Sequence, residues 1–304
     1  MTPPTFNLEP PPLYYAHIPK TGGTSLFVFL RDSYGRRHTF PSLTRQEFLS
    51  YQPEARHSYR LFVGHWGTDI HTLLPPKTLW MTILRDPVEQ LMSWFYHMHH
   101  VVPRYPQHYA PLARWQPIIE NDLQAAMADS FITSQLTNQQ TRFLATAVHY
   151  APFANTGDWE LYDDHTRTAA SLENLAQHAL TNLAHMSLVS VTERFNDTIQ
   201  LLCHRLGLIP PWVRPVYNLN KQRQQMSPVY YRRQLAPDLL RQVEALVRYD
   251  LDLYATARQR LNTQLAETDF SRRVWAIRPF FRQILYSTAR GLWQPFHPRR
   301  TRAH

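Results

Sequence analysis

The chain has 304 residues, 43% hydrophobic and 13% aromatic, which excludes disorder of the whole chain and allows a substantial buried core. Its one cysteine, Cys203, excludes a disulfide framework within the chain and suits a reducing compartment. Eight of the nine net positive charges are arginines between residues 271 and 304, where no acidic residue occurs. The rest of the chain is therefore nearly neutral, and we expect no nucleic-acid partner.

The ends of the chain differ in composition from its middle. Residues 1–12 are rich in proline and are expected to form a flexible arm, without the basic start and apolar core of a signal peptide. No apolar run approaches the roughly 18 residues of a membrane span. We therefore expect one soluble, cytoplasmic domain over residues 13–270, followed by a basic amphipathic tail over 271–304.

The stretch LYYAHIPKTGGTSLFVFL, residues 13–30, predicts a strand, a tight turn and a helix. Leu13 to Ile18 form an apolar run typical of a buried strand, and Pro19 ends it. Gly22 and Gly23 would let the backbone turn sharply and a ligand approach closely.

The expected helix would be capped by Thr24 or Ser25 and end near Asp32. A helix that starts after a glycine turn presents free N–H groups and a positive dipole end, which together favour an anion. Lys20 adds a full positive charge. This pattern predicts a phosphate-binding loop, although a turn that merely contains glycines would share it.

Two further strands are predicted at residues 60–66 and 78–84. His65 stands at the end of the first, where ligands collect in open parallel sheets, although a structural histidine is the commoner case at such a position. Arg85 follows the second strand, and Asp86 and Pro87 favour the start of a helix running towards His100.

A pair of side chains near this second helix suits another phosphate. Ser93 lies eight residues after Arg85, about two helical turns on. A guanidinium supplies a planar fork of donors, and a serine supplies a hydroxyl, so the two could grip one phosphate. A capped helix whose arginine makes an ion pair is the plainer alternative.

The order Lys20-Thr21-Gly22-Gly23-Thr24-Ser25 is not a Walker A motif, in which the lysine follows the glycines. It resembles the 5′-phosphosulfate loop of sulfotransferases that use 3′-phosphoadenosine 5′-phosphosulfate (PAPS). With His17 to Pro19 in front, it is similar to the branch that contains the heparan sulfate 2-O-sulfotransferases. The Arg-Asp-Pro at 85–87 with Ser93 resembles that family's 3′-phosphate motif, and Gly64-His65 falls where the branch carries its catalytic base.

The resemblance implies an α/β fold, a P-loop-like three-layer sandwich with a central parallel sheet flanked by helices. It implies an enzyme that moves a sulfuryl group from PAPS to an acceptor hydroxyl on a glycan or glycoconjugate, releases adenosine 3′,5′-bisphosphate (PAP) and needs no metal. Animal enzymes of this type are usually anchored in the Golgi membrane, whereas this chain resembles a soluble, bacterial version. The implied site has His65 as base, Lys20 as a catalytic and PAPS-binding residue, and the remaining PAPS-binding residues Thr21, Gly22, Gly23, Thr24, Ser25, Arg85 and Ser93.

The other segments are less informative. Helices are expected over 44–51, 112–147, 171–182 and 235–265, and a fourth strand over 186–192 with Glu193 behind it. Within 112–147, the polar run at 138–142 is similar to one that relatives carry near the active site. Irregular stretches at 101–117 and 151–164 could line the acceptor side, and 216–223 could close over the nucleotide. His97, His99 and His100 invite a metal site, but no cysteine or carboxylate joins them at ligand spacing.

Two rival functions stay open. A P-loop-like kinase or nucleotide-binding enzyme would require Mg²⁺ and turn over ATP. A non-catalytic protein on the same fold would bind glycans or membranes through its tail. A basic helix with aromatic residues over 271–304 suits an anionic membrane surface such as the inner membrane of a bacterium. Docking of this helix on the body of the protein is the alternative.

Overall fold

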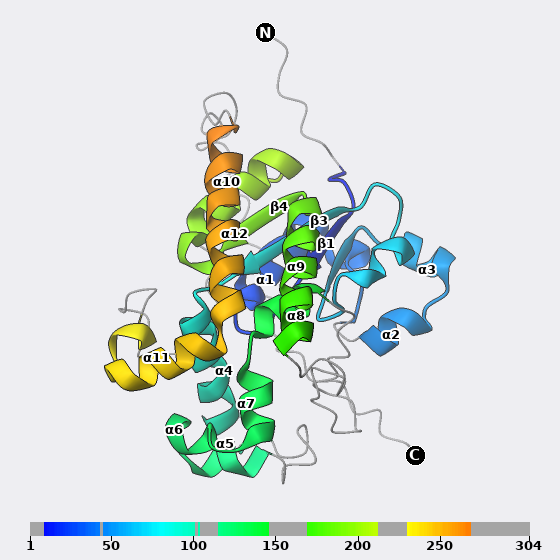
Figure 1. The fold of residues 1–304 in the computed structure, drawn as a ribbon. Helices are drawn as coiled ribbons and strands as arrows, with labels where there is room; N and C mark the ends of the chain where they lie inside the picture. Colours follow the sequence, from blue (N-terminus) through cyan, green and yellow to red (C-terminus); the bar gives the residue numbers. More distant parts are fainter. Residues whose placement is uncertain are drawn as a thin grey trace, which may run out of the picture. The chain divides into compact units, whose positions relative to one another are not determined.

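A computed structural model describes residues 9–42, 45–100, 103, 115–145, 169–211 and 230–268 (Figure 1). These residues belong to one compact unit that ends at Thr268. Most of the stretch 101–117, the stretches 151–164 and 216–223, and the tail 271–304 lie outside the described residues.

The centre of the fold is a four-stranded parallel sheet. Its strands, in the spatial order β2-β1-β3-β4, are β1 Leu13–Ala16, β2 Leu61–Gly64, β3 Leu79–Leu84 and β4 Leu188–Val191. All four were expected from their apolar runs, and each is a few residues shorter than the run or matches it closely. The structure thus confirms a mixed α/β architecture with a parallel sheet flanked by helices.

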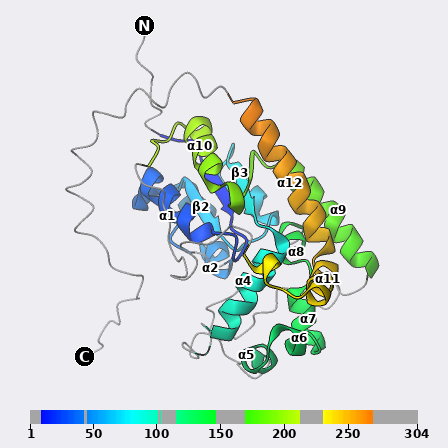
Figure 2. The same cartoon turned by 90° about the vertical axis from the view of Figure 1, so that its left-hand side faces the viewer.

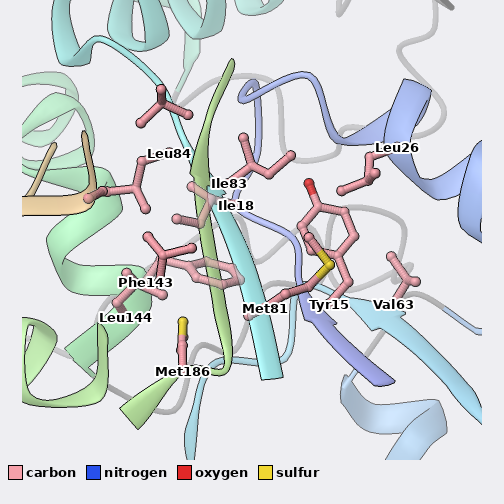
Figure 3. Close-up of a cluster of buried hydrophobic side chains, with 14 of the residues drawn as sticks. Tyr15, Ile18, Leu26, Val63, Met81, Ile83, Leu84, Phe143, Leu144 and Met186 are labelled. Carbon is pink, nitrogen blue, oxygen red and sulfur yellow. The ribbon is translucent and has the colours of Figure 1, made fainter. Parts of the chain in front are cut away.

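Helices cover both faces of the sheet. Figure 2 shows the sheet between α1 and α10 on one side and α9 and α12 on the other. The strands are buried on both faces, which is why they are continuous apolar runs rather than alternating ones. Figure 3 shows Leu26 of α1 and Phe143 and Leu144 of α8 converging on the strand residues Tyr15 and Met81.

The helices that follow β1 to β3 are short except for α1 and α4. They are α1 Gly23–Tyr34, α2 Arg45–Ser50, α3 Pro53–His57 and α4 Pro87–His100, with 3-10 turns η1 Arg36–His38 and η2 Asp69–Leu73. The later helices are α5 Gln116–Glu120, α6 Leu123–Ala126, α7 Ser130–Leu136, α8 Gln139–Ala145, α9 Ala169–His185, α10 Phe195–Leu206, α11 Pro237–Leu246 and α12 Arg248–Ala266, with 3-10 turns η7 Thr192–Arg194 and η9 Tyr231–Arg233.

Two helix expectations were too coarse. The described part of 112–147 forms four short helices, because Asp122 and Asp129 each accept a hydrogen bond from a backbone N–H three residues on and so start new helices, α6 and α7. The long helix expected over 235–265 is broken at Val247 into α11 and α12.

The break at Val247 is stabilised by Asn138 from a distant part of the chain. Its backbone N–H donates to the Leu246 carbonyl at the end of α11, and its side-chain oxygen accepts from the N–H groups of Tyr249 and Asp250 at the start of α12. Asp250 in turn accepts from the first N–H groups of α8, those of Gln140 and Thr141. The two helix starts therefore cap each other.

Other local expectations differ in detail. α1 begins at Gly23, so Thr24 and Ser25 lie in its first turn instead of capping it. α10 ends at Leu206 and is capped by Gly207, which adopts a left-handed conformation with φ 66°. Residues 9–12, expected in the flexible arm, are held against the sheet: Tyr34 donates to the Pro11 carbonyl and Leu79 to the Pro12 carbonyl. No helix in the described part of the chain is long and apolar enough to cross a membrane.

Candidate functional site

Lys20, His65 and Arg85 meet at the carboxyl ends of β1, β2 and β3, where His65 and Arg85 both contact the segment that follows β1. From β1 the chain moves outward to β2, and from β3 it moves the opposite way to β4, so the strand order reverses between β1 and β3. Ligands of open α/β sheets bind outside such a reversal, where the two connecting segments diverge. The segment from His17 to Gly22, here called the β1 loop, and Arg85 occupy this position.

The signs of φ along the β1 loop alternate as they do in an anion-binding nest. The angle φ is positive at Lys20 (67°) and at Gly22 (82°), and it is not positive at Thr21 between them. Alternation of this kind turns successive N–H groups towards one concave side, where they can surround an anion. For Lys20, which has a Cβ, the left-handed conformation costs about 1–2 kcal/mol, so the surrounding contacts must hold it in place.

Side chains hold five consecutive carbonyls of the β1 loop. One donor belongs to the loop itself, one lies on α4, and the other three directly follow β2, β3 and β4. In order along the loop, His65 Nδ1 lies 2.6 Å from the His17 oxygen, Thr21 Oγ1 2.9 Å from Ile18, Gln90 Nε2 3.1 Å from Pro19, Arg85 Nη1 3.0 Å from Lys20, and Thr192 Oγ1 2.6 Å from Thr21.

These hydrogen bonds fix the direction of the peptide N–H groups. In a trans peptide the carbonyl and the next N–H point to opposite sides of the chain. The carbonyls of Pro19, Lys20 and Thr21 point towards the side chains that donate to them. In each of these peptides, the N–H group of the next residue therefore points away from that side chain. The loop therefore presents backbone donors and the Lys20 side chain at the start of α1, an arrangement that suits a phosphate or sulfate group.

The two glycines of the loop have different roles. Gly22 supplies the left-handed turn before α1. Gly23 already has a helical conformation, but its missing side chain makes room for His17: a Cβ on Gly23 would approach the His17 imidazole to well inside 3.0 Å, a separation that real Cβ atoms do not reach. The sequence predicted close approach by a ligand, whereas at Gly23 the approaching group is the protein's own imidazole.

His65 is half-buried and is attached to the β1 loop. Because its partner, the His17 carbonyl, can only accept, Nδ1 must carry the proton, and in the neutral ring Nε2 is then the acceptor. The His17 ring lies against it with 4.6 Å between centroids. Burial lowers the pKa of His65 to about 4, although the hydrogen bond to the His17 carbonyl partly opposes this. His65 is therefore neutral at pH 7, as a base must be, and a weaker base than an ordinary histidine.

Arg85 is buried at the end of β3 and contacts the loop. Its guanidinium donates to the Lys20 carbonyl and forms an ion pair with Glu89, with 3.5 Å between Nη2 and Oε2. Its backbone N–H and carbonyl are both bound by the side-chain amide of Gln140, each at 2.9 Å. Arg85 thus contacts the β1 loop and helps to hold it, a role that the sequence did not predict.

The start of α4 is capped by Asp86, which accepts from the N–H groups of Val88 and Glu89. The Asp86 N–H donates to Glu193 at 3.0 Å, so Glu89, three residues on, does not complete a capping box with it. Glu89 accepts from the Arg232 N–H in addition to pairing with Arg85. Glu193 also accepts from Tyr254, and burial is the main cause of its raised pKa.

The histidines of α4 separate into different surroundings. His97 is one helical turn beyond Ser93 and shares its face. Burial, and then the positive charge of Lys20, lowers the pKa of His97 to about 3, which places this imidazole within electrostatic range of the β1 loop. His99 instead contacts the Ile118 carbonyl, with 2.9 Å from Nδ1 to the oxygen. Among the described residues, no group of three or more His, Cys, Asp or Glu side chains could hold a metal ion.

Sequence reasoning missed several residues that support the site. Gln90 bridges the Pro19 carbonyl and the buried side chain of Gln139, and Thr192 contacts the loop from the end of β4. The spacing of four residues between Ser93 and His97 could have marked His97. The run at 138–142 contacts Arg85 through Gln140, and only its resemblance to relatives had placed it near the site. The contacts of Gln90 and Thr192 with the loop correspond to no pattern in the neighbouring sequence.

No protein-family model matches this chain, and no curated protein matches it. The functional argument therefore rests on the motifs and on the geometry around the β1 loop. That geometry combines an anion-binding nest, a lysine, a buried arginine and a neutral imidazole with a defined acceptor nitrogen. Such a set can bind a charged leaving group and accept a proton from an attacking hydroxyl.

Proposed function

We propose that this chain is a PAPS-dependent sulfotransferase on a P-loop-like, three-layer α/β sandwich. The observation that carries the proposal is the hydrogen bond between His65 and the β1 loop, in which Nδ1 donates to the carbonyl of His17, the first residue of the loop. This hydrogen bond fixes the position of the proposed base relative to the proposed anion site. The order of the loop motif, with Lys20 before the glycines, favours a sulfotransferase over a Walker-type enzyme.

In the proposed reaction, Nε2 of His65 takes the proton of the acceptor hydroxyl as its oxygen attacks the sulfur of PAPS. The bond between sulfur and the bridging oxygen of the 5′-phosphate breaks, and its electron pair leaves with PAP. Lys20 and the N–H groups of Thr21 to Thr24 stabilise the negative charge that develops on this leaving group, whereas the Ser25 N–H donates to the Gly22 carbonyl. Arg85 and Ser93 bind the 3′-phosphate and so keep the donor in line for attack.

The lowered pKa of His65 favours its proposed role as a base, because it keeps the imidazole neutral at pH 7. A base with a pKa of about 4 is almost wholly neutral at pH 7, so no fraction of the enzyme is lost to protonation. The proton that it accepts must then pass quickly to solvent, and the ring is half-buried rather than enclosed. The acceptor is proposed to be a carbohydrate hydroxyl, on resemblance alone.

The test is to incubate the full chain with PAPS, a panel of hydroxylated glycans and glycoconjugates, and EDTA, and to measure PAP release. Transfer that persists in EDTA supports the proposal if His65→Ala abolishes it while PAP affinity falls by no more than about tenfold, the loss expected for one loop hydrogen bond. His178→Ala is the matched control, because His178 is exposed on α9. Turnover of ATP that requires Mg²⁺ would favour a kinase, and His65→Ala with normal transfer would remove the base assignment.

A further inference from the structure

Thr192 joins the ends of β3 and β4 to the β1 loop. It is the first residue after β4, and its Oγ1 lies 2.6 Å from the Thr21 carbonyl oxygen and 3.0 Å from that of Leu84. Its methyl group is also close to the loop, because a Cβ placed on Gly22 would lie 3.3 Å from Thr192 Cγ2. Thr192 therefore fixes both the direction of the Thr21 carbonyl and the space beside the left-handed Gly22.

We infer that Thr192 is a positioning residue for the anion loop: its hydroxyl fixes the Thr21–Gly22 peptide so that the Gly22 N–H faces the bound phosphosulfate. The inference rests on the proposed function for the identity of that ligand. Thr192 acts through the backbone of the loop and is not assigned any contact with the substrate.

The geometry explains why the hydroxyl matters more than the shape of the side chain. A hydroxyl has one proton, and of the two carbonyls within reach the nearer is that of Thr21, so the loop is the better-placed acceptor. Loss of the hydroxyl would leave the Thr21 carbonyl without this donor. Rotation of the peptide towards another donor would then also turn the Gly22 N–H away from the anion.

This role differs from that of the other side chains on the loop. Arg85 and His65 are assigned to the ligand as well as to the loop, so their substitution would remove two functions at once. Gln90 is buried within a chain of side-chain amides, and its substitution would disturb α8 as well. Thr192 is half-buried, and valine reproduces its shape without the hydroxyl, so it separates loop positioning from direct ligand contact.

The experiment compares the wild-type chain with Thr192→Val, which removes the hydroxyl, and Thr192→Ser, which retains it. Thr133→Val is the matched control, because the half-buried Thr133 also donates to a carbonyl, that of Met127, but within the α7 region. PAP affinity is measured by titration calorimetry, and backbone hydrogen exchange is measured for peptides covering residues 17–25.

We expect Thr192→Val to bind PAP about tenfold more weakly, the effect of losing one buried hydrogen bond, and to exchange faster over residues 17–25. Thr192→Ser should restore affinity to within about twofold, and Thr133→Val should change neither measurement. Equal weakening by valine and serine would overturn the inference, as would unchanged affinity and exchange in Thr192→Val. If the wild-type chain did not bind PAP, the proposed function would fail, and the exchange measurement alone would decide the role of Thr192.

Discussion

Replacement of Gly23 by alanine tests whether the packing of the β1 loop has been understood. Gly23 is the first residue of α1 and does not have a positive φ. On helix propensity alone, alanine there should stabilise the protein by up to about 1 kcal/mol. The structure predicts the opposite sign, because the new Cβ would overlap the His17 imidazole.

The size of the effect follows from how firmly His17 is held. Its ring packs against those of Tyr15 and His65, with centroid distances of 5.3 Å and 4.6 Å, so a displacement of the ring would disturb these contacts. Overpacking of this kind costs about 1–3 kcal/mol. Because the new Cβ would overlap three atoms of the His17 ring, we place the cost in the upper part of this range, about 2–3 kcal/mol. After a propensity gain of up to about 1 kcal/mol, we expect a net loss of about 1–2 kcal/mol, which lowers the melting temperature by several degrees. PAP affinity should also fall as the displaced His17 pushes on the loop.

The assay is thermal or urea unfolding of Gly23→Ala, His17→Ala and the double variant. If overlap with the imidazole is the cause, the double variant should be more stable than the sum of the single changes predicts, since the shortened side chain makes room for the new methyl group. A Gly23→Ala protein as stable as the wild type, with intact PAP binding, would refute the argument.

Three further predictions concern charges at the site and the fold around it. The ratio kcat/KM for PAP release should fall at acid pH with a midpoint near pH 4, because burial lowers the pKa of His65 to about 4. The same pKa shift stabilises the folded protein above pH 6.5, and this stabilisation is lost as the pH falls from about 6.5 to 4. In urea unfolding, His65→Ala should lack this pH-dependent contribution to stability. Arg85→Lys keeps the charge but loses the fork that reaches both the Lys20 carbonyl and Glu89, so PAP affinity should fall at least about tenfold by calorimetry, and equal affinity would contradict the assigned geometry. Asp250→Ala removes the acceptor for two N–H groups at the start of α8 and should lower the free energy of unfolding by about 1–3 kcal/mol in a urea titration, whereas exposed Asp252→Ala should change it little.

The sequence predicted the sheet well because the strands carry their own signal. Each is a short apolar run; Gly64 is the last residue of β2, Arg85 directly follows β3, and Pro19 lies three residues after the end of β1. A strand buried on both faces needs such a run whatever lies around it. The helix α4 was equally predictable, because its Asp-Pro start is a local signal that the structure confirms.

The break between α11 and α12 could not be predicted from neighbouring residues. The pattern over 235–265 is helical throughout, and the interruption at Val247 is stabilised by Asn138, more than a hundred positions earlier in the chain. Tertiary contacts of this kind override local propensity without changing the local pattern.

The candidate site divides in the same way. Lys20, His65 and Arg85 were marked by motifs, and the structure brings them to one end of the sheet. The partners that orient them were not predictable, since Gln90 and Thr192 meet the loop only after the sheet has formed. Their separations from the loop, 71 and 171 positions, leave no periodic pattern to detect.

The hydrogen bonds that hold the β1 loop also affect the rate of ligand association. Ordering one backbone residue costs about 1–2 kcal/mol of free energy. Because side chains bind five successive carbonyls of the loop, this cost is met when the protein folds and not when a ligand binds. Association should then be a single step whose rate follows collision with the ligand, with no slow phase for closure of the loop itself. A rigid loop of this kind would take up donor and release product in the same shape, so one turnover leaves it ready for the next.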